Sequence, residues 1–344
     1  MKVCLVGAEG DFVKDDGDGV KRYMYEIYTQ LHKLEKEGLR IEKHEFKRLP
    51  FFAGGFSPAI GSIFYNFSKY DIIHNLEPKP LMPTRRGNAL QITTMHDFHG
   101  LLRPEKEDYL SITRRLGLKF VLQYGLKQAL KTSDYIFCNS TQTKNEAVEL
   151  GFAKEKIFVT ALGVDDRYLK PRRLKKNQQI YKVGYIGSLS ATKNVGFAIK
   201  AFKKVKGKNF AFEIWGKWDR EYSHLVEMSK EDKRIKFMGF APEDKIVDIY
   251  DSFDLFVHPS LYEGFCLPIL EAQNRGLPVV TYSKAVIPNE IKRHTIQVND
   301  EDEMAAVISS RPRQQGEAHS YARKFTWKEC ARKTLEAYEK ILSE

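Results

Sequence analysis

Cysteine is scarce in this sequence, and its spacing suggests neither a metal site nor a disulfide framework. The 344 residues include four cysteines, and no two of them form a Cys-x-x-Cys pair. Zinc sites and small disulfide-linked folds are built from closely spaced cysteines. We therefore expect free thiols and a reducing, cytoplasmic environment.

Long apolar runs and a targeting segment are also missing. No stretch approaches the roughly 18–20 apolar residues that cross a bilayer, and residues 1–8 run into charged residues too soon for a signal peptide. Helix-turn-helix, zinc-finger and RNA-recognition signatures are absent as well. The net charge of +11 attracts anions, but it is spread over both halves apart from a basic run at 172–182. We expect peripheral membrane contact rather than insertion, and no nucleic acid as a partner.

The sequence does contain a regular alternation of β-branched or aromatic runs with helical segments. A first series has strands at 2–6, 71–75, 90–96, 135–139 and 157–160, with helices at 20–36, 116–131 and 143–150. A second has strands at 182–186, 210–215, 235–238, 255–258 and 278–282, with helices at 195–204, 222–229, 242–250 and 268–275. This rhythm is typical of parallel sheets covered by helices.

We predict an α/β fold with two doubly wound, Rossmann-like domains that face a central cleft. Because the rhythm breaks at 169–180, the first domain spans 1–170 and the second 171–325. A last helix, within 326–344, can pack back on the first domain. Ligands of open α/β sheets bind beyond the carboxyl ends of the strands, so residues that directly follow strands are the first candidates for a site.

Two glutamates, Glu263 and Glu271, stand on either side of Pro268 after a predicted strand. Proline is favoured in the first turn of a helix, because its missing N–H costs nothing there. Glu263 should then lie in the loop and Glu271 about one turn into the helix. The unpaired amides at this helix start favour an anion or a sugar hydroxyl, and carboxylates accept hydrogen bonds from adjacent hydroxyls of a polyol.

The segment Glu263-Gly-Phe-Cys-Leu-Pro-Ile-Leu-Glu271-Ala resembles the E-x7-E signature of glycosyltransferase family 4. The likeness extends along most of the chain, at 139–141, 163–165, 183–194, 237–250, 254–260 and 325–327. It implies a GT-B fold and a retaining transfer of a hexosyl unit from a nucleotide-diphosphate sugar, UDP- or GDP-linked. It also implies that Glu263 lies beside the donor sugar and that Glu271 binds the ribose.

Lys193 follows a predicted strand, in a loop with Gly187, where a lysine can neutralise a diphosphate leaving group. The family carries a basic pair in this loop, but Ser188 stands where an arginine is usual. Arginine and lysine are not equivalent phosphate ligands, so Lys193 is the main expected clamp. Cys266 likewise replaces a frequent glycine, although its backbone N–H stays available.

A glycine-rich loop with Gly17 and Gly19 follows the first strand and permits close approach of the backbone to donor or acceptor. Asp16 and Asp18 could instead be a pair of metal ligands. The surrounding glycines and the helix that follows favour the loop. We therefore expect no metal and no cofactor.

His96 and Asp97 end a predicted strand. A histidine can hydrogen-bond a sugar hydroxyl or share a proton near neutral pH, and His96 resembles the active-site histidine of the family. Asp97 and Ser140 are weaker candidates for the acceptor side. His74 also follows a strand and is a second, lesser candidate.

An aromatic, glycine-rich segment at 51–67 could touch a lipid-linked acceptor or a membrane surface. Arg85, Arg86, Arg114 and Arg115 could add a basic face nearby. Core plus a loop is the alternative interpretation, and we favour it.

The residues and the resemblance predict a metal-independent, retaining glycosyltransferase that acts on a glycan, a lipid-linked or a small-molecule acceptor. The expected catalytic residues are His96, Glu263 and Lys193. The expected donor-binding residues are Gly17, Gly19, Gly187, Ser188, Lys193, Phe240, Gly264, Phe265, Cys266, Leu267 and Glu271. A sugar phosphorylase or a nucleotide-sugar epimerase on the same fold is the alternative, and a basic nucleic-acid-binding protein is the weaker one.

Overall fold

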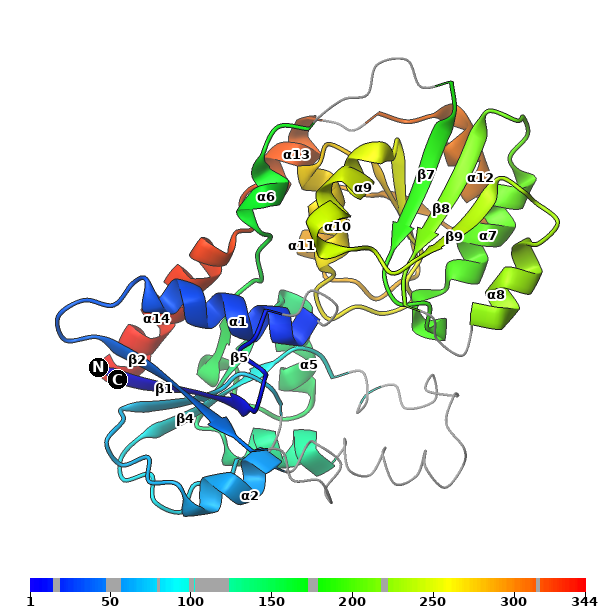
Figure 1. The fold of residues 1–344 in the computed structure, drawn as a ribbon. Coiled ribbons are helices and arrows are strands. Elements are labelled where there is room, and N and C mark those ends of the chain that lie inside the picture. Colours follow the sequence, from blue (N-terminus) through cyan, green and yellow to red (C-terminus); the bar gives the residue numbers. More distant parts are fainter. Residues whose placement is uncertain are drawn as a thin grey trace. The chain divides into compact units, whose positions relative to one another are not determined.

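Two compact units make up the computed structural model, which describes residues 1–14, 19–47, 57–78, 81–98, 102, 124–172, 179–217, 222–313 and 316–344. Unit 1 comprises Met1–Gly163 and Trp327–Glu344, and unit 2 comprises Val164–Thr326. Within the described residues, each unit has one six-stranded sheet whose strands all pair in parallel (Figure 1). The predicted α/β fold with two doubly wound sheets is confirmed.

The sheet of unit 1 runs in the order β2-β1-β3-β4-β5-β6. Its strands are β1 (Lys2–Ala8), β2 (Arg40–Phe46), β3 (Ile72–Asn75), β4 (Leu90–Met95), β5 (Tyr135–Cys138) and β6 (Ile157–Val159). Strands β1, β3 and β4 are almost entirely buried, as expected for parallel strands covered on both faces. The order reverses between β1 and β3, which makes the loops after these strands a natural binding edge.

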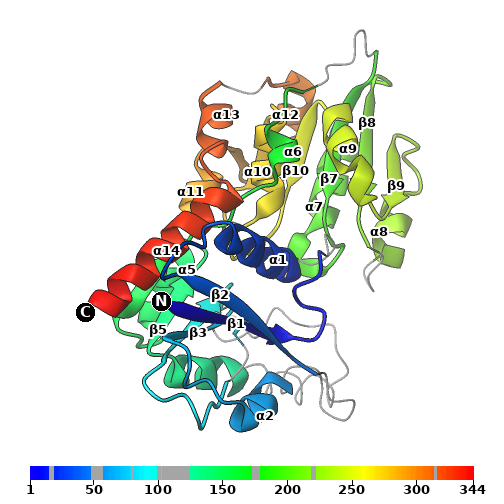
Figure 2. The same cartoon turned by 60° about the vertical axis from the view of Figure 1, so that its left-hand side comes forward.

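The helices of unit 1 are α1 (Gly19–His32), α2 (Ser57–Phe64), α5 (Thr141–Glu149) and α14 (Trp327–Ser343), with a further helix at 124–132. As predicted from its periodicity, α1 buries Tyr23, Ile27 and Leu31. Helix α14 packs against α1, and the two lie side by side in both ribbon views (Figures 1 and 2). The last helix of the chain therefore belongs to unit 1.

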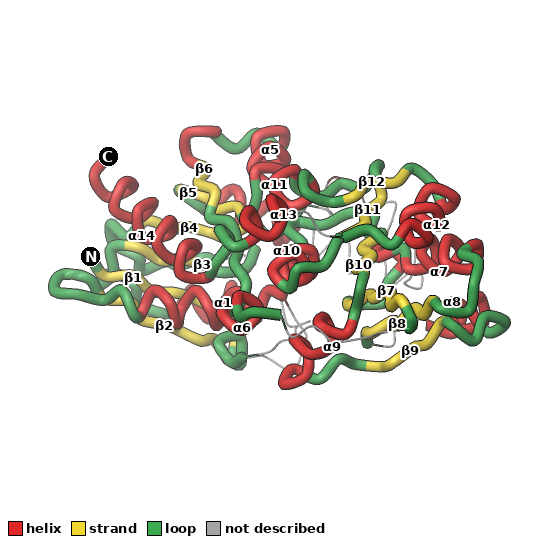
Figure 3. The backbone as a smooth tube through the Cα atoms, turned by 90° about the horizontal axis from the view of Figure 1, so that it is seen from above, coloured by secondary structure: helices red, strands yellow, loops and turns green. Residues whose placement is uncertain are grey.

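The sheet of unit 2 runs in the order β12-β11-β10-β7-β8-β9, which can be followed in Figure 3. Its strands are β7 (Tyr181–Ile186), β8 (Phe210–Trp215), β9 (Ile235–Gly239), β10 (Leu255–His258), β11 (Val279–Tyr282) and β12 (Ile296–Val298). This is the strand order of a Rossmann sheet, and its reversal falls between β7 and β10. The loops after β7 and β10 therefore begin side by side.

Helices of unit 2 pack on this sheet around an apolar core that includes Phe202, Phe212 and Met304. They are α6 (Asp166–Leu169), α7 (Val195–Lys204), α8 (Tyr222–Ser229), α9 (Ile246–Ser252), α10 (Leu267–Asn274), α11 (Asn289–Lys292), α12 (Glu301–Ser310) and α13 (Gly316–Ala322). Three short 3-10 helices in the described chain are η2 (Lys154–Lys156), η3 (Ala191–Lys193) and η4 (Glu243–Lys245).

The chain enters unit 2 at Val164, earlier than the predicted boundary at 170. Short helix α6 is held there by Arg275, which is 1% exposed. The guanidinium donates to the Tyr168 carbonyl at 3.1 Å and, through two nitrogens, to the Asp251 carboxylate at 2.8 Å each. Such a buried, bidentate pair fixes the position of the Arg275 side chain, and with it that of α6. The local sequence of α6 does not predict this contact.

Several elements of the structure were not predicted from the sequence: β2, β12, α2, α6, α11, α12 and α13. Part of the predicted helix at 116–131 lies outside the described residues, as do Asp16, Gly17, Asp18, Arg114 and Arg115. No helix in the described part of the chain has both the length and the apolar character needed to cross a membrane.

Candidate functional site

The candidate site of unit 2 lies at the carboxyl ends of β7 and β10, where the strand order reverses. Two backbone-directed hydrogen bonds fasten the loops that follow these strands. The amide of Leu261 donates to the Thr192 carbonyl at 2.8 Å, and the Asn194 side chain donates to the Pro259 carbonyl at 3.2 Å. Asn194 takes a left-handed conformation, φ 52°, which asparagine tolerates better than most residues. This arrangement holds Lys193 beside the loop after β10.

Glu263 is the centre of the site, and it is 9% exposed. The ammonium of Lys193 donates to both carboxylate oxygens, at 2.8 and 2.9 Å. His258, the last residue of β10, contacts the same carboxylate through Nε2 at 2.7 Å. A carboxylate that two nitrogens bind at these distances is fixed in orientation.

The electrostatics of this cluster keep Glu263 charged. Burial disfavours the carboxylate, but Lys193 and His258 outweigh burial and hold the pKa of Glu263 well below its ordinary value. A charge attraction of this kind acts with little screening at a buried position. The site therefore contains a permanent negative charge whose direct counter-ion is Lys193.

Glu271 lies in α10 and is 5% exposed. The hydroxyl of Tyr250, from α9, donates to its Oε2 at 2.8 Å. Burial, followed by the nearby Glu271 carboxylate, raises the pKa of Tyr250 well above its ordinary value, so the phenol keeps its proton. Tyr250 thus orients the second glutamate of the motif, as Lys193 and His258 orient the first.

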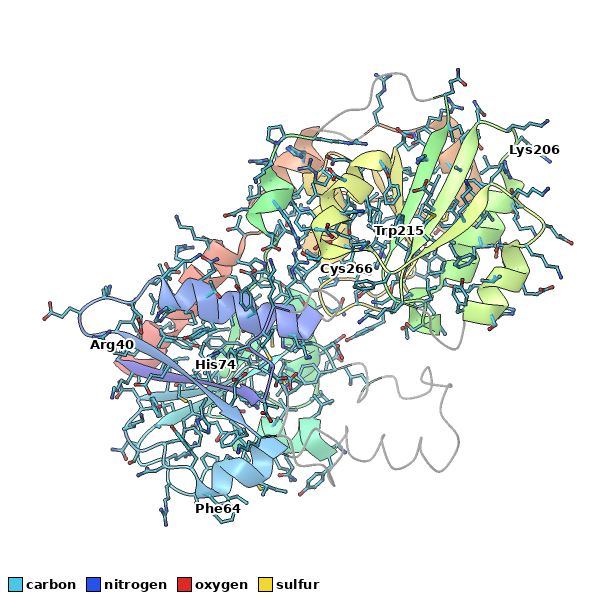
Figure 4. All side chains as sticks on the ribbon, in the orientation of Figure 1. Arg40, Phe64, His74, Lys206, Trp215 and Cys266 are labelled. Carbon is cyan, nitrogen blue, oxygen red and sulfur yellow. The ribbon has the colours of Figure 1, made fainter. Side chains whose placement is uncertain are left out.

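Cys266 begins α10 between the two glutamates, where Figure 4 labels it. Its backbone has φ 81° and ψ 71°, a region that glycine adopts far more easily than other residues. Burial raises the pKa of the thiol well above its ordinary value, and both Glu263 and Glu271 add to this effect. The neighbouring Phe265 and Leu267 side chains are buried, so the predicted contribution of these positions would come from backbone amides.

The loop after β7 approaches the next strand closely at Gly187. A Cβ atom on Gly216 would come within 2.0 Å of the Gly187 carbonyl oxygen, so no larger residue fits there. The hydroxyl of Tyr185 donates to the Ser188 carbonyl at 2.6 Å and shapes the same turn. Ser188 itself is exposed, and its hydroxyl pairs with that of Ser190 at 3.3 Å.

Phe240, the predicted residue of the base pocket, follows β9 and is 52% exposed. The ammonium of Lys217 lies 5.2 Å from its ring centroid, a cation–π distance. Lys217 follows β8, the neighbouring strand. An exposed aromatic face with a cation beside it is suited to stacking a planar ring.

The remaining predicted residues lie in unit 1. His96 follows β4, is 8% exposed, and donates from Nε2 to the Leu76 carbonyl at 2.9 Å. Its ring packs edge-on against Tyr23, with centroids 5.0 Å apart. Asp97 is half-buried directly after it, and Gly19 begins α1.

Ser140 has a structural role in the described chain. Its side chain is fully buried and accepts a hydrogen bond from the Thr143 amide at 3.1 Å, as the N-cap of α5. His74 is also fully buried, between Tyr338 and Thr94. A residue enclosed in this way contacts protein groups rather than an acceptor.

Two family models match this chain. The model described as Glycosyltransferase Family 4 covers residues 34–168, and the one described as Glycosyl transferases group 1 covers residues 166–324. Together the two matches span residues 34–324 and identify the chain as a glycosyltransferase of the family 4 type.

Relatives of this glycosyltransferase include two from Escherichia coli. The O-antigen chain mannosyltransferase B is 24% identical over 292 residues, which are 76% of this chain and 73% of that protein. The UDP-Gal:alpha-D-GlcNAc-diphosphoundecaprenol alpha-1,3-galactosyltransferase is 28% identical over 260 residues, 68% of this chain and 64% of that protein. The second match therefore spans less than two thirds of its relative.

Solved structures share the fold of this glycosyltransferase at low identity. Anabaena HepE in complex with UDP and glucose has a TM-score of 0.71 and 17% identity, and the match covers 99% of this chain and 100% of that one. Sucrose-phosphate synthase from Thermosynechococcus elongatus has a TM-score of 0.74 and 16% identity, with 99% of each chain covered. These likenesses confirm the predicted GT-B fold.

One residue of the site that the sequence analysis missed is His258. It was placed on a strand, and its position as the last residue of that strand was the available signal. His258, Glu263 and Cys266 bring one potential metal ligand each to within 4.8 Å of one another. Lys193 already neutralises the carboxylate, and the raised pKa of the thiol opposes the thiolate that a metal needs. We assign no metal ligand among them.

Proposed function

We propose that this glycosyltransferase moves a hexosyl unit from a nucleotide-diphosphate sugar, UDP- or GDP-linked, to a carbohydrate or lipid-linked acceptor with retention of configuration. The observation that carries the proposal is the Lys193–Glu263 pair at the switch point of the second sheet. It combines an ammonium for a diphosphate with an oriented carboxylate for sugar hydroxyls. Glu271 and the helix start of α10 stand next to it in the same motif.

The donor is assigned to unit 2 by matching chemical groups to residues. Lys193 would bind the diphosphate, with the amides at the start of α10. Glu271, oriented by Tyr250, would accept the hydrogen bonds of two ribose hydroxyls. The base would stack near Phe240, and Glu263 with residues 264–267 would hold the hexose. A complex with UDP and glucose is known for Anabaena HepE, which supports a sugar-nucleotide donor on this fold.

In the proposed reaction the bond between the anomeric carbon and the diphosphate breaks, and the acceptor hydroxyl attacks from the same face. Positive charge at Lys193 would stabilise the leaving diphosphate. The leaving phosphate would accept the proton of the acceptor hydroxyl. Because side chains and amides carry this charge, we propose that no divalent metal is required. His96, in unit 1, stays a predicted catalytic residue.

A lipid-linked acceptor is supported by two observations. One relative is named for a diphosphoundecaprenol-linked sugar acceptor. In this chain Phe64, at the end of α2, is 76% exposed and Met82 is 47% exposed, with Arg85 exposed nearby in sequence. Apolar and basic side chains of this kind suit an interface with anionic lipid.

The first experiment is a thermal-shift panel with UDP, GDP, ADP, their monophosphates and common sugar conjugates. A ligand at about 100 times its Kd adds about 2.7 kcal/mol of stability. We expect one nucleoside diphosphate to stabilise well beyond its monophosphate, because Lys193 adds a contact to the second phosphate. With that donor, release of free nucleoside diphosphate should require an acceptor, and lipid-linked and free glycans should be compared. Turnover without an acceptor would instead indicate the phosphorylase or epimerase alternative.

Variants locate the activity in the proposed site. Glu271→Ala and Lys193→Ala should each lower transfer by at least about 100-fold, since each removes a charged contact to the donor. Lys208→Ala, in an exposed loop of the same unit, is the matched control and should leave transfer unchanged. Normal rates in both site variants would contradict the proposed function.

A further inference from the structure

Lys292, the last residue of α11, is a buried lysine that the proposed reaction does not use, and it is 7% exposed. Its ammonium donates to the Ser283 carbonyl and, at 2.9 Å, to the Ala285 carbonyl. Burial lowers the pKa of this lysine, and no carboxylate of the described residues offsets that effect. Because a buried ammonium is unfavourable unless it is hydrogen-bonded, its place in the fold depends on these two carbonyls.

The backbone of Lys292 is itself fixed to the second sheet. Its amide donates to the Pro288 carbonyl at 3.0 Å, and its carbonyl accepts from the amide of Thr295 at 3.0 Å and from the Thr295 hydroxyl at 2.7 Å. The same hydroxyl contacts that of Thr281, in β11, at 2.7 Å. The lysine side chain therefore extends from an anchored backbone, and it can hold a neighbouring loop in place.

The loop that Lys292 holds is bonded to the loop that carries Glu263. The Ala285 carbonyl belongs to the same peptide group as the Val286 amide. Because a peptide group is planar and rigid, the ammonium on this carbonyl fixes the direction of the amide. The Val286 amide donates to the Leu261 carbonyl, and the Glu263 amide donates to the Val286 carbonyl, both at 2.9 Å. Val286 thus holds the backbone on both sides of residue 262.

We infer that Lys292 positions Glu263 for the hexose of the donor, by fixing the loop at 283–286 to which the Glu263 backbone is bonded. This inference rests on the proposed function, in which Glu263 contacts the hexose and other residues bind the nucleotide. Lys193 and His258 orient the Glu263 carboxylate, whereas the loop at 283–286 places its backbone. Lys292 is thus a positioning residue, which acts on the donor through Glu263.

Loss of the ammonium should affect one part of the donor more than the rest. Without Lys292 two loop carbonyls lose their donor, so the loop at 283–286 can shift and take the Glu263 backbone with it. The groups proposed for the nucleotide have anchors of their own: the Lys193 amide donates to the Ser190 carbonyl at 2.9 Å, and Glu271 lies in α10. The contact to the hexose should therefore weaken while the contacts to the nucleoside diphosphate persist.

The test is calorimetric titration of the full chain with UDP and UDP-glucose, and with GDP and GDP-mannose. Lys292→Met removes the N–H donors but keeps a long, unbranched side chain. We expect it to raise the Kd of the nucleotide sugar about tenfold relative to that of its nucleoside diphosphate, the effect of one weakened hydrogen bond to a charged group. Lys284→Met is the matched control, because Lys284 is exposed and lies between the two bonded carbonyls in sequence. It should leave this ratio unchanged.

The outcomes separate this inference from the proposed function. If the unaltered protein binds none of the four probes, the proposed function fails and this inference fails with it. An unchanged ratio in Lys292→Met overturns the inference alone, whether both probes bind normally or both are weakened equally, because Glu263 is then not selectively misplaced. If Lys292→Met does not fold, Lys292→Gln replaces it: its shorter side chain keeps a polar group but does not reach both carbonyls, so the same change in the ratio is expected.

Discussion

At the scale of single residues, Cys266 has the most unusual backbone of the site. Its φ of 81° lies in the left-handed region, at which a side chain costs about 1 kcal/mol or more relative to glycine. We therefore expect Cys266→Gly to be more stable than Cys266→Ala, by about 1 kcal/mol. Urea unfolding of the two variants measures this difference.

The matched control is Cys138, which is also fully buried but lies in the extended strand β5. There the usual order should hold, with alanine more stable than glycine by roughly 0.5–1 kcal/mol. If the glycine and alanine variants had the same order of stability at both positions, the backbone conformation would not explain why glycine is frequent at the position of Cys266.

The residue types of the site could be predicted, but their contacts could not. Lys193 and Glu263 follow strands, Glu271 lies about one turn into a helix, and their charges suit a sugar nucleotide. That Lys193 pairs with Glu263, and that His258 completes the cluster, depends on β7 and β10 being neighbours. Two other strands lie between β7 and β10 in the chain, so the local sequence does not predict that these strands are neighbours. The roles assigned to these residues in catalysis stay predictions.

At the scale of secondary-structure elements, α14 is attached to the first sheet through His74. Nδ1 of His74 contacts the Tyr338 hydroxyl of α14, and Nε2 contacts Thr94 of β4 at 2.8 Å. Burial, with a smaller contribution from His96, lowers the pKa of His74 from 6.5 to about 3. The folded state therefore binds fewer protons at His74 than the unfolded chain does between these pH values.

This difference predicts that acid weakens unit 1. The free energy of unfolding should fall as pH drops below about 6.5, by up to about 1.4 kcal/mol per pH unit. His74→Gln keeps a polar side chain but does not titrate, so its slope between pH 6.5 and 5 should be flatter. Urea unfolding at several pH values tests this, with His224→Gln as the control. Equal slopes in His74→Gln and the unaltered protein would contradict the assignment.

The elements that sequence patterns missed have weak or mixed signals. Strand β2 alternates charged and apolar residues and lies at the edge of its sheet, where one side needs no partner strand. Strand β12 is three residues long and also lies at an edge. The buried strands β1, β4 and β10 were predicted because parallel strands covered on both faces are nearly all apolar.

At the scale of the whole molecule, unit 1 is built from both ends of the chain. Trp327, at the start of α14, is 3% exposed and lies 6.3 Å from the Tyr23 ring, and Tyr338 stacks on Phe137 at 5.6 Å. Removing residues 327–344 would uncover this apolar surface. We expect such a chain to lose amide protection in β1, β3, β4 and α1, while β7, β8 and β10 of unit 2 keep theirs.

Hydrogen exchange followed by mass spectrometry measures this protection strand by strand. A chain that ends at Leu342 is the control, because Ser343 and Glu344 are exposed and their loss should leave the protection of β1 and β3 unchanged. Unchanged protection of β1 and β3 in the shorter chain would show that unit 1 folds without its last helix. Both sheets were predicted from the series of strands in the sequence. The packing of the last helix on the first domain was only one of the possibilities that the sequence left open.

Unit 1 consists of two segments that are far apart in the sequence, and this affects the order in which the two units can fold during synthesis. Domains usually fold in the order in which they are synthesised, but here the second unit is contiguous and the first is not. Unit 2 can fold before α14 is synthesised, whereas the first sheet waits for that later helix. Until then Tyr23 and Phe137 lack their aromatic neighbours from α14. Newly made chains should therefore need chaperone protection at their amino-terminal half longest, although that half is made first.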